Sequence, residues 1–87
     1  MSPIDLSQAL RRRPFEPFRI QVSDGTTHDV RHPELVMVGL NAVSIGVPAA
    51  GLPYPVYERM ETVSLAHVVK LLPLDGQPVG PGTAKSE

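Results

Sequence analysis

Apolar and polar residues alternate in the first third of the chain, which predicts a strand with one buried face. Phe18, Ile20 and Val22 are separated by single polar residues, and side chains two positions apart lie on the same face of a strand. Asp24-Gly25 follows, the pair that a tight two-residue hairpin turn favours. A second strand, antiparallel to the first, is therefore expected directly after this turn.

A short helix is expected before this hairpin. Ser2 can cap its N-terminus, Pro3 is tolerated in its first turn, and Asp5 interacts favourably with the helix dipole there. Beyond the hairpin, short apolar segments are separated by turns that contain Pro, Gly or Asn. The pattern places the helix at residues 2–13 and the strands at residues 17–23, 26–31, 35–40, 42–47, 57–63 and 67–72.

The segment 35–40 reads LVMVGL, a continuous apolar run that is typical of a strand covered on both faces. The N-terminal helix can cover one face. A neighbouring subunit can cover the other, through strand pairing or face packing. The sequence therefore predicts a homo-oligomer whose self-association residues are Leu35, Val36, Met37 and Val38.

Length and composition limit the chain to one small domain. Its 87 residues include 10 Pro and 7 Gly, a composition that suits short strands joined by turns better than long helices. Residues 75–87 contain only two apolar residues, Val79 and Ala84, and cannot bury enough surface to offset the entropy lost on ordering. We therefore expect a single domain at residues 1–74 and a disordered tail at residues 75–87.

Together these elements predict a mainly β fold, a small SH3-like or Sm-like barrel of five to six antiparallel strands with a short N-terminal helix. The order of helix, SDG hairpin, bent strands and closing SLAHVVKLLP segment resembles the bacterial Sm-like RNA chaperones, in topology and over most of residues 5–73. No RNA-binding motif of those proteins can be carried over residue by residue. The RPFEPFRI…SDG…RHPE pattern also resembles small uncharacterised bacterial proteins.

No catalytic, metal or cofactor chemistry is predicted. The chain has no Cys, which excludes disulfides and thiolate sites. Its three His are not spaced for one metal, its Ser residues lack a G-x-S-x-G setting, and there is no glycine-rich phosphate loop. We expect no enzyme activity, no metal and no cofactor. The absence of a membrane span or secretory signal predicts a cytoplasmic protein that does not enter membranes.

Charge bears on nucleic-acid binding. The net charge of −1 gives little long-range attraction for polyanions. One dense run of cations exists, and two further arginines can widen it into a phosphate-binding patch. The candidate nucleic-acid-binding residues are Arg11, Arg12, Arg13, Arg19 and Arg31. The alternative is that the run is a solvated helix end, where cations interact favourably with the helix dipole.

Two functions remain open. The first is a non-catalytic, self-associating interaction or assembly module that recruits a protein partner, whose identity the sequence does not indicate. The second is an Sm-like protein that binds RNA or single-stranded nucleic acid. Such binders normally combine a basic face with aromatic side chains for stacking. Because the chain has no Trp, two Phe and a slightly negative charge, the sequence favours the interaction module.

Overall fold

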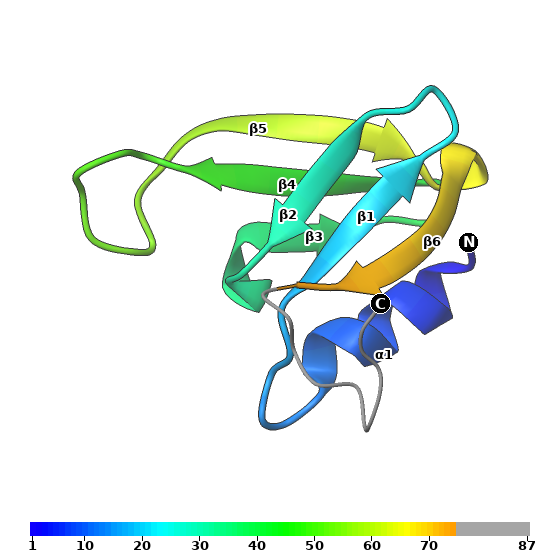
Figure 1. The fold of residues 1–87 in the computed structure, drawn as a ribbon, viewed down its shortest axis with the longest axis horizontal. Helices are drawn as coiled ribbons and strands as arrows, with labels where there is room; N and C mark the ends of the chain where they lie inside the picture. The colour runs from blue at the N-terminus through cyan, green and yellow to red at the C-terminus, as the bar shows by residue number, and fades with distance from the viewer. Residues whose placement is uncertain (75–87) are drawn as a thin grey trace.

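A computed structural model describes residues 1–74, which form one helix and two three-stranded sheets (Figure 1). The sheets have the strand orders β2-β1-β6 and β3-β4-β5, and all pairs are antiparallel. In chain order the elements are α1 (Pro3–Arg11), β1 (Phe18–Val22), β2 (Thr27–Val30), the 3-10 turn η1 (Pro33–Leu35), β3 (Val36–Val38), β4 (Ala42–Pro48), β5 (Tyr57–Ser64), the 3-10 turn η2 (Leu65–His67) and β6 (Val68–Pro73).

Helix α1 begins where its capping residue predicts. The Ser2 hydroxyl accepts a hydrogen bond from the Asp5 amide at 3.1 Å, and Pro3 occupies the first helical position. Leu6 and Leu10, which lie one turn apart on the same face, are buried. The helix ends at Arg11, two residues earlier than expected, because Arg12 already has an extended backbone ahead of Pro14.

The predicted hairpin is present, but its loop has three residues, Ser23, Asp24 and Gly25, instead of two. The Val22 amide closes this loop by donating to the Thr26 carbonyl at 2.9 Å. Along β1 the residues alternate between buried and half-buried, and β2 and β6 flank the strand on its two edges. Gly25 has a φ of 93°, a conformation that glycine adopts without steric cost. The Asp24 carboxylate accepts hydrogen bonds from the Thr26 amide at 2.9 Å and from the Thr26 hydroxyl at 2.7 Å. Local hydrogen bonds therefore hold a turn at the predicted place, one residue longer than expected.

The expected strand at residues 35–40 is shorter in the structure. Pro33 begins the 3-10 turn η1, in which the Leu35 amide donates to the His32 carbonyl at 3.0 Å. Only Val36–Val38 pair with β4. Met37 is 69% exposed and Leu40 is 74% exposed, so nothing within the described residues covers this side of the segment. The coverage on both faces that the apolar run indicated is thus not found within a single described chain.

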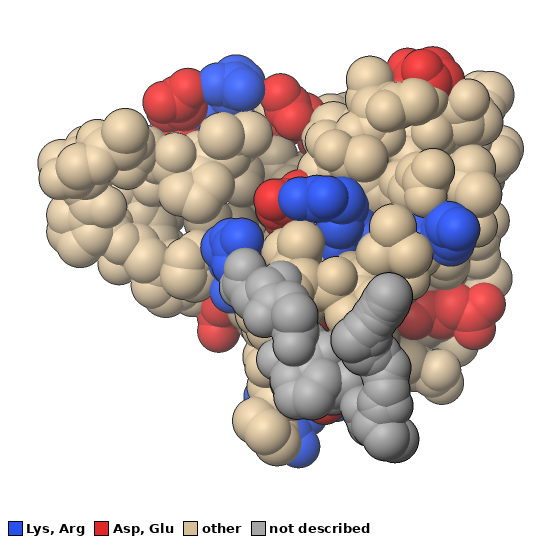
Figure 2. Space-filling view, viewed as in Figure 1, with Lys and Arg blue, Asp and Glu red and all other residues tan. Residues whose placement is uncertain are grey.

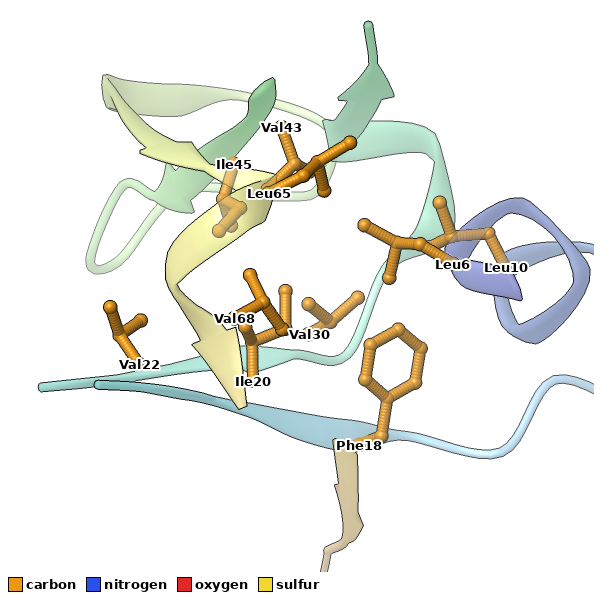
Figure 3. Close-up of a cluster of buried hydrophobic side chains, with 10 residues drawn as sticks. All are labelled: Leu6, Leu10, Phe18, Ile20, Val22, Val30, Val43, Ile45, Leu65 and Val68. Atoms are coloured by element: carbon orange, nitrogen blue, oxygen red, sulfur yellow. The ribbon is translucent and has the colours of Figure 1, made fainter. Parts of the chain in front are cut away.

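The core lies between the two sheets and helix α1 (Figure 3). Side chains from both sheets and from the helix converge in it, and Ile20 and Val43 are fully buried at 0% exposure. Half-buried Val36, Val38 and Val63 pack against its edge. The ten buried members are Leu6, Leu10, Phe18, Ile20, Val22, Val30, Val43, Ile45, Leu65 and Val68.

The structure confirms a small mainly β domain with an N-terminal helix, but no closed barrel is found among residues 1–74. Strands pair only within their own sheet. The turns η1 and η2 interrupt the chain between β2 and β3 and between β5 and β6, at the points where it passes from one sheet to the other. Residues 75–87, expected to form a disordered tail, lie outside the described residues.

Candidate functional site

A cleft of about 410 Å³ opens between the two sheets. Leu35, Val36 and Ile45 form an apolar part of its wall, while Arg19, Arg31 and Arg59 contribute cationic side chains. These residues come from strands β1, β3, β4 and β5 and from the segment between β2 and β3. The cleft therefore exists only when both sheets are assembled.

One polar contact spans the cleft from sheet to sheet. The His28 Nδ1 atom on β2 lies 3.0 Å from the Glu61 Oε1 atom on β5, and the His28 side chain is only 15% exposed. This contact lowers the pKa of Glu61, and a hydrogen bond from Arg59 lowers it further. Glu61 is thus an ionised acceptor held between two donors.

Arg19 and Arg59 in the cleft are paired with carboxylates. Arg19 donates from Nε to Asp29 Oδ1 at 2.7 Å and from Nη2 to Asp29 Oδ2 at 3.3 Å, a bidentate contact. This contact lowers the pKa of Asp29. Arg59 donates from Nε to Glu61 at 3.2 Å and from Nη1 to Glu58. In Figure 2 cationic and anionic atoms are interspersed around the hollow, so this face carries no continuous basic area.

Two further contacts connect the β4–β5 arm, residues 47–58, to η1 and to the residue before it. The rings of His32 and Tyr54 stack with centroids 4.3 Å apart and planes 24° apart. The Tyr54 hydroxyl donates a hydrogen bond to Glu34, which raises the pKa of Tyr54 and lowers that of Glu34. These contacts attach the β4–β5 arm to the body of the protein.

The five arginines predicted to bind nucleic acid are divided between two places. Arg19 and Arg31 line the cleft, whereas Arg11 and Arg13 border a shallower depression at the end of α1. Arg12 forms an exposed ion pair with Glu16 at 2.7 Å, and Arg13 donates to the Leu10 carbonyl at 3.2 Å. The three consecutive arginines are therefore partly engaged at the helix end, as the solvated-end alternative expects.

The four predicted self-association residues also separate. Leu35 is buried, while Val36 and Val38 are half-buried against the core. Met37 alone among them is exposed. A second group of exposed apolar side chains lies on the β4–β5 arm and on β5, outside the segment that was predicted to self-associate. The members of this group are Leu52, Tyr54, Val56, Tyr57 and Met60.

The contacts of the cleft also could not be predicted. His28 and Glu61 are 33 positions apart in the chain, and no local pattern indicates that β2 and β5 face one another. Among residues 1–74 no group of three or more His, Asp and Glu side chains is placed to hold a metal ion. No helix in the same part of the chain is long and apolar enough to cross a membrane.

Comparisons with protein-family models, with curated proteins and with solved structures found no significant match to this chain.

Acid should destabilise the fold. Hydrogen bonds to Asp24, Asp29 and Glu61 lower the pKa of each carboxyl in the folded state. A carboxyl whose pKa is lower in the folded than in the unfolded state stabilises the fold at pH values above its ordinary pKa of about 4. That stabilisation is lost as the pH falls through the lower pKa of the folded state. We expect the melting temperature measured by circular dichroism to be flat above about pH 5 and to fall below about pH 4.

The variant Asp29→Asn removes one of these titrating groups and should make this acid dependence shallower. A melting temperature that stays constant between about pH 5 and pH 2 would contradict the assignment of these carboxylates as ionised partners.

Proposed function

We propose that this protein is a non-catalytic interaction module that self-associates and recruits a protein partner. The observation that carries the proposal is the β4–β5 arm, which projects beyond the rest of the molecule (Figure 1). Its apolar side chains Leu52, Val56 and Tyr57 are exposed. Large apolar side chains exposed close together in the chain, on a projecting segment, suit a protein interaction site.

A second feature supports self-association. In the described residues β5 pairs with β4 on one edge and has no strand partner on the other. An unpaired edge presents backbone donors and acceptors that another chain can satisfy. Exposed Met37 on β3 and Met60 on β5 place further apolar surface on the same sheet. One sheet thus combines an open edge with apolar side chains.

The charges of the cleft favour this function over nucleic-acid binding. Arg19 and Arg59 already contact Asp29, Glu58 and Glu61. A phosphate backbone would have to compete with these carboxylates, and the net charge of −1 gives it no long-range attraction. The Sm-like nucleic-acid binder is therefore the second candidate, and it becomes an outcome of the test.

We also propose that the two sheets are an open variant of the SH3-like or Sm-like barrel. Two observations support this topology. The chain runs from β2 through η1 into β3, which joins the sheets as a single bent strand would, and it returns through η2 to β6 beside β1. The order along this path is then β6-β1-β2 followed by β3-β4-β5.

Light scattering coupled to gel filtration tests the function. We expect the mass to rise with protein concentration from the 9.4 kDa monomer toward at least twice that value. A monomer throughout a range from about 1 µM to several hundred µM would overturn self-association, since specific weak dimers form within that range.

A binding assay with single-stranded RNA at about 150 mM salt tests the second candidate. We expect no binding in the submicromolar range. Submicromolar binding that is lost when Arg11, Arg12 and Arg13 are all replaced by Ala would favour the nucleic-acid function instead, because phosphate contacts would then supply the affinity.

A further inference from the structure

The backbone groups on the open edge of β5 have directions that restrict how a second copy can pair with it. The strand Tyr57–Ser64 has eight residues and lies at the border of the sheet β3-β4-β5 (Figure 1). Near its N-terminal end the register shifts between Val47 and Pro48 of β4, which ends the regular ladder there. The regular part of the edge therefore begins at about Arg59.

The direction of each backbone group follows from one hydrogen bond at the other end of the strand. The Leu65 amide donates to the Asn41 carbonyl at 2.9 Å, one position beyond the pair Ala42–Ser64. Hydrogen-bonded and non-hydrogen-bonded pairs alternate along an antiparallel ladder. Val63, Glu61 and Arg59 therefore direct their N–H and C=O groups toward β4. Thr62 and Met60 direct theirs away from it, toward the open edge.

This alternation restricts the registers in which two copies of β5 can pair. In an antiparallel pair, residues with outward-facing backbone groups must oppose each other. For a two-fold pair this leaves four registers near the middle of the strand. The two-fold axis then passes through Arg59, Met60, Glu61 or Thr62.

Charge selects among the four registers. An axis through Arg59 places two arginines opposite one another, and an axis through Glu61 places two carboxylates opposite one another. Like charges directly across a ladder are destabilising. An axis through Thr62 places Glu61 opposite Val63 and pairs no opposite charges. Only an axis through Met60 places Arg59 of each copy opposite Glu61 of the other, with Met60 opposite Met60.

We propose that two copies of this chain pair through their β5 edges, antiparallel and with Met60 on the two-fold axis. This inference rests on the proposed self-association and specifies its surface and its register. The β3-β4-β5 sheets of the two copies join into one six-stranded sheet. Each Arg59 is then paired with Glu61 of the second copy. Met60 exchanges two backbone hydrogen bonds with Met60 of the second copy. Such an interface is isologous, as a two-fold dimer requires.

The side chains of the edge are suited to this register. Arg59 and Glu61 already contact each other within one chain at 3.2 Å. In the dimer each of these four side chains therefore has opposite charges as neighbours, one in its own chain and one across the interface. Glu61 directs Oε1 to His28 and Oε2 to Arg59, and a carboxylate has acceptor sites for a further donor. Met60 is 38% exposed and supplies apolar contact at the centre.

Single-cysteine variants measure the register directly, because the chain has no Cys of its own. Residues of a hydrogen-bonded antiparallel pair have Cα atoms about 5.5 Å apart, within the range that a disulfide spans. We expect the Met60→Cys variant to form a disulfide-linked dimer under mild oxidation. Thr62→Cys is the matched control on the same edge. In this register its two copies lie about 13 Å apart and do not cross-link.

Charge reversal provides an independent test. Arg59→Glu places a carboxylate opposite Glu61 in both symmetric pairs, and we expect the dimer dissociation constant to rise about tenfold or more. The double variant Arg59→Glu with Glu61→Arg restores opposite charges across the interface and should recover most of the affinity. Arg12→Glu, which changes the net charge equally but lies at the end of α1, should leave the dissociation constant unchanged.

The outcomes separate this proposal from the proposed function. A protein that dimerises without cross-linking at Met60, or that cross-links equally at Thr62, overturns this register and leaves self-association standing. A protein that stays monomeric at every concentration overturns both. Because the cysteine variants keep His28, Arg59 and Glu61, they decide the register even if the charge-reversed double variant fails to fold.

Discussion

The Ile20→Ala variant should lose about 2–5 kcal/mol of unfolding free energy, the range found when large aliphatic side chains are truncated in protein cores. Ile20 is 0% exposed and lies in β1, the central strand of its sheet. Its pairing partners are His28 on β2 and Leu71 on β6. Rigid backbone on both edges limits how far the site can collapse around the cavity, so much of the cavity cost should remain.

Urea unfolding followed by circular dichroism measures this loss. A domain of this size has a small core, so several kcal/mol is a large fraction of its total stability, and a substantial unfolded population is expected at 37 °C. Ile20→Val keeps most of the volume and should cost about 0.5–1.5 kcal/mol. Val69→Ala, on an exposed position of β6, is the matched control. If Ile20→Ala cost no more than Val69→Ala, the placement of Ile20 in the core would be wrong.

The Gly46→Val variant should be destabilised by about 1–3 kcal/mol, the usual cost of forcing extra atoms into a packed site. Gly46 lies in the middle of β4, and a Cβ atom there would be 3.2 Å from both the Leu35 Cβ atom and the Leu35 carbonyl oxygen. It would also lie 3.3 Å from the Met60 sulfur. The methionine side chain can move, but the backbone of η1 cannot move without displacing the buried Leu35 side chain.

Thermal denaturation checks this prediction, with Ala42→Val at the half-buried start of the same strand as the control. Gly46→Ala should lie between the wild type and Gly46→Val, since it adds the clashing Cβ atom without the two further methyl groups. A Gly46→Val protein as stable as the wild type would show that η1 does not approach β4 as closely as the structure has it.

Local chemistry was sufficient to predict the elements at the start of the chain. Ser2 and Pro3 specify a helix start because they satisfy or remove amides that the first turn leaves unpaired. The alternation of Phe18, Ile20 and Val22 specifies a strand and its buried face. Asp24-Gly25 specifies the turn, because glycine accepts the positive φ that the turn requires.

The apolar run at residues 35–40 was misleading for a physical reason. A run of apolar residues indicates that these side chains tend to be buried, but it does not determine the backbone conformation of the run. Pro33 starts a 3-10 turn that contains Leu35, and the run contributes only the short strand Val36–Val38. Self-association through Leu35, Val36, Met37 and Val38 stays a prediction, with Met37 the exposed member of the set.

The candidate site depended on the tertiary structure almost completely. Nothing in the order of residues indicates that His28 meets Glu61, or that Arg19 and Arg31 lie apart from the cations at the end of α1. The charges of β5 can be read from the sequence. They bear on dimer formation only because β5 is an edge strand, and the strand order of the sheet is what establishes this.

The sequence by itself therefore determined the types of element, the hairpin and the inward face of β1. The tertiary structure decided the division into two sheets, the cleft between them and the open edge of β5. The physical reason is that the pattern of side chains indicates which face of a strand is buried. The backbone donors and acceptors that pair strands are the same in every non-proline residue, so they do not indicate which strands pair. Which strand lies beside which is set by the packing of the whole core.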